Sequence, residues 1–324
     1  MEKFWKDMGI SLIMGLIVPA LLLAIVTSFV QNQNAIPEQT LPILEETTTP
    51  AKEQYLSVLT EDGQVVQLPL KEYLTCVLLA EMPVTFEEEA LKAQSVVART
   101  YAMRAVGGAA KHEDAAVCTN SACCQGYVAA DTFLSKGGKK ADVERIRQIV
   151  ASTDREVLTY EGKLIEATYF SCSGGTTEDA VAVWGTDVPY LQSVSSPGEE
   201  HATHYTDTVS FQSAEFAEKL ALAAAGKPSG WFGETTYTEG GGVATMRIGG
   251  TEFKGTELRK LLGLRSAAFE VTVDGDMIYI TTRGFGHRVG MSQYGADAMA
   301  SAGSSYVQIL AHYYQGTELT LLTD

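Results

Sequence analysis

Hydrophobic residues change their spacing several times along the chain, and each change predicts a different element. Apolar and polar positions alternate over Tyr55–Leu59 and again over Gln64–Leu68, with polar turn residues between them, which is the pattern of a β-hairpin. From Leu70 onward the apolar side chains recur at helical intervals. That helix is expected to end near Glu81, because Pro83 disfavours helical geometry in the residue before it.

A second helix is expected to follow directly. Thr85 and Glu88 have the spacing of a capping box, which favours a helix that begins there and runs to about Arg104. Helical spacing recurs over residues 141–151, 213–225, 292–301 and 304–313, strand-like alternation over 157–160, 164–170, 243–248, 269–273 and 277–282, and a loop is expected over 226–242. Because helices and strands are interspersed without a regular βαβ order, we expect an α+β fold of mixed helices and short antiparallel strands.

One segment differs from the rest because it carries no charge. Residues 8–30 form an apolar run of 23 residues, about 34 Å as a helix and long enough to cross a bilayer. No small-x-small cleavage site follows, so we expect an uncleaved transmembrane anchor. Two lysines before it favour residues 1–7 as a cytoplasmic tail. Residues 31–54, polar and without periodicity, predict a stalk, and residues 55–324 an extracytoplasmic domain.

The charge of the chain argues against some classes of binding partner. The formal net charge is −16, and the first thirty residues are balanced, so this charge lies on the outer part. Such an acidic domain argues against nucleic acid as a partner and against adsorption to anionic lipid. A ligand would therefore need a local groove rather than overall attraction.

Cysteines form a local cluster. Cys118, Cys123 and Cys124 lie within seven residues and His112 precedes them, so four candidate ligands fall within thirteen residues. Zinc prefers four tetrahedral Cys and His ligands, and a Cys-rich set is more often structural than catalytic, so we expect one structural zinc ion per chain. Two alternatives stay open: free or bridged thiols in an oxidising compartment, and a catalytic zinc centre with Glu113 as the nearby acid.

Glu81 is the candidate for acid–base chemistry. It falls at the predicted C-terminal end of the first helix, where the helix dipole disfavours negative charge, and apolar Leu79 and Met82 lie beside it. Both effects favour the protonated acid, which can deliver a proton to a leaving group. The alternative is an ordinary solvated glutamate, the commonest state of this residue type.

Polar residues on the second helix are candidates for the same site. Lys92 and Arg99 are seven residues apart and lie on one face of a helix, while Tyr101 lies on another row. The alternative for Lys92 is an ion pair with Glu88, four residues earlier.

Two further motifs carry the short polar and aromatic side chains that sugar-binding sites use. The first is YFSCSGG at residues 169–175, and the second is GFGHRVGMSQYGA at residues 284–296, where glycines let a ligand approach the backbone. The alternatives are a tight glycine turn with Trp184 in the core, and a structural role for the histidine of the second motif.

The segment 70–104 and the motif 284–296 together resemble the stage II sporulation protein D family, and the resemblance extends from about Val65 to Thr320. Members of that family are membrane-anchored lytic transglycosylases that cut the glycan strands of peptidoglycan during engulfment of the forespore. The resemblance implies that Glu81 is the catalytic acid. It also implies a substrate groove, for which the candidate binding residues are Lys92, Arg99, Tyr101, Ser171, Ser173, Tyr190, His287, Ser292 and Gln293.

The resemblance implies the chemistry and the setting as well. A lytic transglycosylase needs one enzymatic acid/base, because the muramic acid 6-hydroxyl attacks the anomeric carbon and gives a 1,6-anhydro product without water. The implied substrate is a glycan strand denuded of stem peptides. The implied partners are stage II sporulation proteins P and M, in the mother-cell membrane facing the septal space. Some members bind zinc through two His and two Cys, whereas Cys123 stands here in place of a histidine.

Two other functions stay open from the sequence. A relative of the family is an amidase enhancer, a non-catalytic module that binds glycan and activates a partner cell-wall hydrolase. Glu81 favours the enzyme over the activator, since an activator does not need the acid. The other is a zinc hydrolase centred on His112 and the cysteines, which would need an open coordination position.

Overall fold

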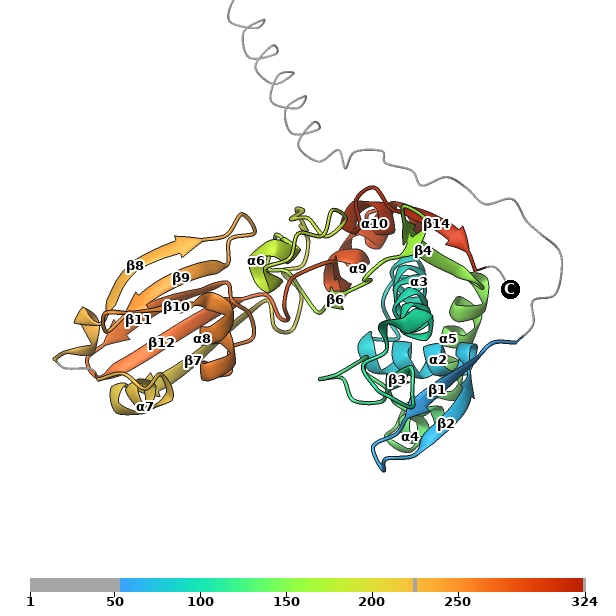
Figure 1. Ribbon diagram of the computed structural model, residues 1–324, viewed down its shortest axis with the longest axis horizontal. Helices are drawn as coiled ribbons and strands as arrows, with labels where there is room; N and C mark the ends of the chain where they lie inside the picture. Colours follow the sequence, from blue (N-terminus) through green and yellow to red (C-terminus); the bar gives the residue numbers. More distant parts are fainter. Residues whose placement is uncertain (1–52, 224–225, 323–324) are drawn as a thin grey trace, which may run out of the picture. The chain divides into compact units, whose positions relative to one another are not determined.

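The computed structural model describes residues 53–223 and 226–322 (Figure 1). The predicted cytoplasmic tail, the anchor over residues 8–30 and all but the last two residues of the stalk lie outside the described residues. Within the described ranges, no helix is both long and apolar enough to cross a membrane. Helices and short strands are interspersed throughout, which confirms the α+β class.

The described chain has two hydrophobic cores. Residues from 56–194 and 289–319 build the larger core, and we call this part the helical subdomain. Residues 206–283 carry a second core of their own, and we call this part the strand subdomain. The two halves of the helical subdomain are therefore separated in sequence by the whole of the strand subdomain.

The helical subdomain begins with the predicted hairpin. β1 (Tyr55–Leu59) pairs antiparallel with β2 (Val65–Pro69), and β3 (Val117–Cys118) joins β1 in parallel. α2 (Leu70–Glu81) follows at once. It ends where expected, since Met82 before the proline is extended.

Two small sheets bring together strands from distant parts of the helical subdomain. β14–β4–β5 is antiparallel, whereas β6 pairs with β13 in parallel. The remaining elements here are the π-helical turn η1 (Ala105–Ala109), α4 (Ala130–Ser135), α5 (Lys140–Ser152), β4 (Glu156–Tyr160), β5 (Lys163–Leu164), β6 (Tyr169–Phe170), α6 (Ala180–Trp184), β13 (Met291–Ser292), α9 (Gln293–Ser301), α10 (Tyr306–Tyr313) and β14 (Glu318–Leu321). The strand predicted over 164–170 is thus divided between the two sheets.

α3 (Glu88–Arg104) packs against α2, α5, α9, α10 and β4, so much of the helical subdomain is assembled around it (Figure 1). The predicted capping box at its start is wrong. The N–H of Phe86 donates to the carbonyl of Pro83, which keeps Thr85 in a turn. The helix therefore begins later, with Glu87 as its N-cap residue.

The strand subdomain consists of two antiparallel sheets, β11–β12–β7 and β10–β9–β8. Its elements are β7 (Thr206–Gln212), α7 (Ser213–Lys219), the 3-10 turn η2 (Pro228–Gly230), β8 (Phe232–Tyr237), β9 (Val243–Ile248), β10 (Thr251–Lys254), α8 (Gly255–Leu262), β11 (Phe269–Asp274) and β12 (Met277–Arg283). Phe216, Leu258 and Ile278 lie in its core, each from a different element.

Two predictions for this subdomain are wrong. The Ala-rich helix expected to reach residue 225 ends at Lys219, because Ala221 has a left-handed φ of 50° that a continuing helix does not allow. The loop expected over 226–242 contains β8. Threonines favour this strand, since the hydroxyls of Thr236 and Thr245 share a hydrogen bond of 2.8 Å across to β9.

Arg99 lies inside the helical subdomain, against the C-terminal end of α5. It is 1% exposed, and its guanidinium donates to the carbonyl oxygens of Val150 and Glu156, each at 3.1 Å. Thr153 Oγ1 lies 3.4 Å from the same group. Arg99 therefore supplies a donor to the last turn of α5, where carbonyl groups lack intrahelical partners.

Arg99→Ala should lower the free energy of unfolding by about 2–3 kcal/mol, because it leaves buried carbonyl oxygens without a donor. Arg147→Ala is the matched control, since Arg147 forms only an exposed ion pair with Glu72, worth about 1 kcal/mol or less. Urea unfolding of the two variants measures the difference. Equal, small losses would contradict the interior role of Arg99.

Candidate functional site

An open groove of about 730 Å³ lies at the C-terminal end of α2. Both subdomains contribute to its wall. The lining includes Glu81, Tyr101, Arg104, Lys111, Cys123, Cys124, Gln125, Glu166, Tyr169, Ser171, Trp184, Arg259, His287 and Gln293.

Glu81 brings its carboxyl group to this groove from the last residue of α2. Oε1 accepts two hydrogen bonds, one from the backbone N–H of Gly126 and one from the hydroxyl of Tyr169 at 3.0 Å. Glycine is needed at position 126, because a Cβ there would lie 2.8 Å from Oε1. With Oε1 engaged by two donors, Oε2 is the oxygen that can hold a proton and transfer it.

Tyr169 is itself held by a chain of hydrogen bonds that runs into the protein interior. Its hydroxyl accepts from Gln125 Nε2 at 3.1 Å, and Gln125 Oε1 accepts from the hydroxyl of Tyr73 at 3.3 Å. Burial, and secondly the nearby Glu81, raises the pKa of Tyr169 well above its usual range. Tyr169 is therefore a neutral donor, and the chain fixes the orientation of the carboxyl group.

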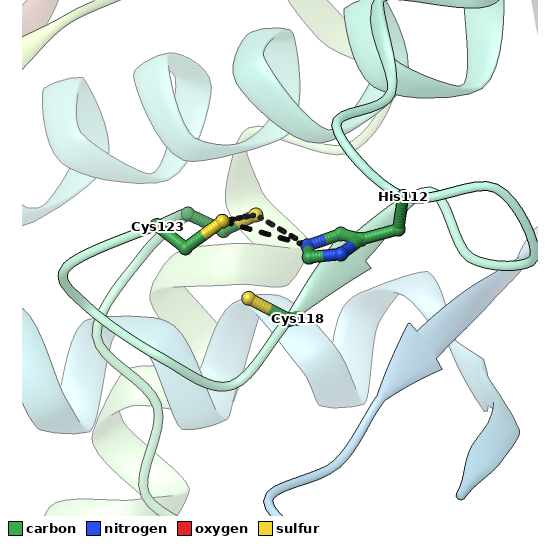
Figure 2. A group of neighbouring side chains, drawn as sticks. His112, Cys118 and Cys123 are labelled. Carbon is green, nitrogen blue, oxygen red and sulfur yellow. Dashed lines mark hydrogen bonds between the residues drawn. The ribbon is translucent and has the colours of Figure 1, made fainter. Parts of the chain in front are cut away.

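Four candidate metal ligands gather in one cluster (Figure 2). His112, Cys118, Cys123 and Cys124 each offer one ligand atom, and these atoms lie within 4.8 Å of one another. His112 Nε2 is 3.6 Å from the sulfur of Cys123 and from that of Cys124, and the two sulfurs are 3.9 Å apart. A tetrahedral ion with bonds of about 2.1–2.3 Å holds its ligand atoms about 3.6–3.8 Å apart. The cluster therefore has the dimensions of a metal site.

A short loop joins the cluster to the acid. Cys124 is followed directly by Gln125 and Gly126, which bond to Tyr169 and Glu81. A shift of the cluster would therefore move the donors that hold the carboxyl group. No spacing rule identifies Gln125 or Gly126 as site residues. Their place directly after two cysteines, and that of Tyr169 at the head of YFSCSGG, are the signals in the sequence.

His287 lies in the groove wall between two aromatic rings. Its ring centroid is 5.7 Å from that of Phe170 and 5.5 Å from that of Trp184, and its Nδ1 accepts from the N–H of Val289 at 3.1 Å. Burial, and secondly the charge of Arg259, lowers the pKa of His287 to about 4. The ring is therefore neutral near pH 7. Because Nδ1 accepts from Val289, the proton is on Nε2, and the ring also has a hydrogen bond with the backbone of Tyr169, which acts against the lowering of its pKa.

Trp184 forms part of the groove wall, so the alternative that places it in the core is wrong. It is the last residue of α6 and is 43% exposed. The helix stops there because Gly185 takes a left-handed conformation with φ of 76°. An exposed indole in the wall of the groove that also holds Glu81 offers a flat apolar face on which a sugar ring can pack.

Tyr101, Ser171 and Gln293 also line the groove. Lys92 and Arg99 do not belong to its lining. Lys92 forms ion pairs at 2.8 Å with Glu88 and at 2.9 Å with the next residue, so the alternative pairing is the one that the structure contains. Arg99 is enclosed by the end of α5. We therefore leave both cations out of the proposed site.

Ser173, Tyr190 and Ser292 hold the backbone near the groove rather than facing it. Ser173 Oγ donates to Glu199 at 2.8 Å, and the hydroxyl of Tyr190 accepts from the N–H of Glu166 at 3.0 Å. Ser292 Oγ caps the first turn of α9. Because these polar groups already have protein partners, we treat the three residues as supports and not as substrate contacts.

Fold and groove together define an α+β protein with a hydrogen-bonded carboxyl group in an open groove and a His/Cys cluster on the adjoining loop. A family model described as stage II sporulation protein matches residues 60–160. Stage II sporulation protein D of Bacillus amyloliquefaciens is 41% identical over 266 residues, which cover 81% of this chain and 77% of the relative. The chain belongs to the stage II sporulation protein D family.

Two further relatives come from Bacillus subtilis (strain 168). Its stage II sporulation protein D is 40% identical over 270 residues, covering 81% of this chain and 77% of the relative. Its amidase enhancer is 30% identical over 298 residues, covering 74% of this chain but 39% of that protein. The family therefore includes proteins with both kinds of name.

His287→Gln should change how stability depends on pH. The unfolded chain protonates this histidine below about pH 6.5, whereas the folded chain does so only near pH 4. The stability that depends on the neutral ring is therefore complete above pH 6.5 and is lost as the pH falls toward 4, by up to about 1.4 kcal/mol per unit. The wild type should lose stability relative to the variant between pH 7 and pH 5 in thermal unfolding. A constant difference would contradict a buried, neutral His287.

Proposed function

We propose that this chain is a peptidoglycan lytic transglycosylase that acts in forespore engulfment, with Glu81 as its acid/base. One observation carries the proposal: Oε1 of Glu81 is held by two donors, which leaves Oε2 for the proton. A group oriented in this way can protonate a glycosidic oxygen that is bound in the groove. Family membership supports a role in sporulation and a cell-wall substrate.

The reaction has two proton transfers. Glu81 first gives its proton to the leaving glycosidic oxygen, and positive charge develops at the anomeric carbon of a muramic acid residue. The hydrogen bonds from Gly126 and Tyr169 stabilise the carboxylate that forms. The carboxylate then accepts the proton of the substrate's own 6-hydroxyl, whose oxygen bonds to the anomeric carbon. The product has a 1,6-anhydro end, and water is not consumed.

Two wall residues suit the sugar. Trp184 offers an exposed ring face, and the neutral ring of His287 lies beside it in the groove wall. Because His287 is neutral near pH 7, it is a poor general acid, and its role is to form, with Trp184, the aromatic wall against which a sugar can bind. Proton transfer is therefore assigned to Glu81.

Hydrolysis is the first competing chemistry. A second carboxyl group, Glu166, lines the same groove, and a hydrolase of the two-carboxylate type would use such a group to activate water. Arg104 lies 3.6 Å from Glu166, so this carboxylate already has a counter-ion. We therefore assign Glu166 a structural part in the groove.

The second candidate function is that of a glycan-binding activator. It is favoured by the similarity to an amidase enhancer, which is 30% identical. An activator would bind the same strand without using Glu81. The two functions therefore differ in whether the carboxyl group is needed for an effect on the glycan.

We also propose that the His/Cys cluster holds one structural zinc ion. Three thiolates and one imidazole suit zinc, and four protein ligands fill a tetrahedral site, which argues against a zinc hydrolase. Cys123, which stands in place of a histidine, would leave the loaded site about one charge negative. Lys111 donates to the carbonyl of Cys123 and lies close enough to offset that charge. Bound zinc would hold the loop that carries Gln125 and Gly126.

The cellular setting belongs to the same proposal. The chain would be anchored by residues 8–30 in the mother-cell membrane, with its acidic domain facing the septal space. Stage II sporulation proteins P and M would be its partners, the former by removing stem peptides before the glycan is cut. The family resemblance is the support for these partners.

Glu81→Gln should slow cleavage strongly but keep glycan binding, because the amide has the shape of the acid and cannot transfer the proton. The rate on denuded glycan strands should fall roughly 10²-fold or more. Glu166→Gln is the matched control, and it should retain cleavage. Reaction in ¹⁸O-labelled water, followed by mass analysis, should show anhydro ends without label.

Other results would decide against this chemistry. Labelled ends, together with an inactive Glu166→Gln variant, would identify a hydrolase. If the wild type and Glu81→Gln were equally inert on glycan yet both stimulated an amidase, the activator function would replace the enzyme.

The full-length chain, purified in mild detergent, should carry about one zinc ion per molecule. Cys118→Ser should lose the ion and melt at a lower temperature, because structural zinc contributes to folding. Cys76→Ala, which changes a buried thiol outside the cluster, should keep its zinc. Elemental analysis and thermal unfolding measure both effects. A metal-free protein of unchanged stability would show that the cysteines have another purpose.

A further inference from the structure

Three cations line the groove of a chain whose formal net charge is −16. Two of them have partners within the protein. Arg104 lies 3.6 Å from Glu166, and the ammonium of Lys111 donates to the carbonyl oxygen of Cys123. The third cation is Arg259, which comes from the strand subdomain.

Arg259 belongs to the last turn of α8, and no acidic residue in the described part of the chain pairs with its charge. Over residues 53–223 and 226–322, its side chain has neither an ion pair nor a hydrogen bond. Burial lowers its pKa below the ordinary value, yet a guanidinium stays charged at physiological pH. A half-buried charge without a counter-ion is unfavourable, so a ligand that supplies the opposite charge would be bound well here.

A second donor without a partner lines the same groove. Gln293 is 6% exposed, and its Nε2 is buried without a hydrogen-bond partner among the described residues. Buried side-chain amides usually have partners, so this donor also indicates a ligand. One charged and one neutral donor in the groove that holds Glu81 suit a carboxylate that lies beside other oxygen acceptors.

We propose that Arg259 binds the free lactyl carboxylate of a muramic acid residue in the substrate strand. The inference rests on the proposed function, since muramic acid is the sugar that carries the lactyl ether. With a stem peptide attached, the lactyl carbonyl is an uncharged amide. Once the peptide is removed, it is a carboxylate, which matches the forked guanidinium. Arg259 therefore makes the groove selective for denuded strands.

The net negative charge of the chain does not prevent Arg259 from binding a carboxylate in the groove. At physiological ionic strength the Debye length is about 8 Å, so distant acidic side chains are screened from a carboxylate in the groove. The nearby charge of Arg259 acts at hydrogen-bond distance, where screening is weak. A protein that repels polyanions at long range can therefore still select one carboxylate at close range.

Binding of glycan to the full-length chain tests the proposal, with Glu81→Gln present so that nothing is cut. Three probes are compared: denuded strands, denuded strands with carboxylates converted to methylamides, and strands that keep their stem peptides. Adding Arg259→Gln should weaken binding of denuded strands about tenfold or more, the scale of one charge-assisted hydrogen bond, and leave the other two unchanged. The affinity of the Arg259→Lys protein for denuded strands should lie between those of the Arg259 and Arg259→Gln proteins. Lys260→Gln, at the exposed next position on α8, should change none.

The three probes distinguish a lactyl carboxylate from a stem-peptide carboxylate, and they distinguish a failure of the Arg259 proposal from a failure of the proposed function. If Arg259→Gln weakened binding only of peptide-bearing strands, the bound carboxylate would be that of the stem peptide, and the proposal would be overturned. Equal weakening of all three probes would also overturn it. If the Glu81→Gln protein bound the three probes with equal affinity, the proposed selectivity would be overturned, whereas the transglycosylase function would be unaffected. If the parent bound no glycan, the proposed function would fall and this inference with it. If Arg259→Gln did not fold, the binding of the three probes to Arg259→Lys would test the proposal in the same way.

Discussion

The two hydrogen bonds to Oε1 of Glu81 constrain the positions of several segments that are far apart in the sequence. They require the end of α2, the loop at Gly126 and the strand β6 to come within hydrogen-bond distance of one another. Position 126 must lack a side chain, because a Cβ would press on Oε1. The supporting Gln125 is buried and Tyr169 is half-buried, and a buried polar group left unpaired costs about 1–3 kcal/mol. The donors therefore have one favourable arrangement, and it orients the acid.

A buried ion pair likewise fixes the position of a loop of the strand subdomain against the segment that carries His287. Arg288 Nη1 lies 3.0 Å from Glu178, and both side chains are 4% exposed. Arg288 also donates to the carbonyls of Thr176 and Gly240, the latter in the loop between β8 and β9. A buried ion pair contributes little net stability, but its partners tolerate few other positions. It thereby fixes a loop of the strand subdomain against the segment that carries His287, the neutral histidine of the groove wall.

The sequence by itself determined the features that depend on neighbours in the chain. Pro83 ends α2 at Glu81, so local sequence alone places the candidate acid at a helix C-terminus. Apolar spacing also predicted α3 and the hairpin β1–β2, since both depend on local periodicity. The His/Cys cluster could be predicted for the same reason: its four candidate ligands lie within thirteen residues, and a loop that short can bring them together.

Only the tertiary structure decided which of these side chains face the groove. Arg99 and Tyr101 are two positions apart on α3, yet α5 encloses the first and the second lines the groove. Helical periodicity specifies the faces of α3 but not what packs against each of them. Tyr169 reaches Glu81 across 88 positions, and Arg259 joins the groove from a separate core. Contacts of this kind depend on how whole subdomains pack, because burial and hydrogen bonding are satisfied by the complete core rather than by any single segment.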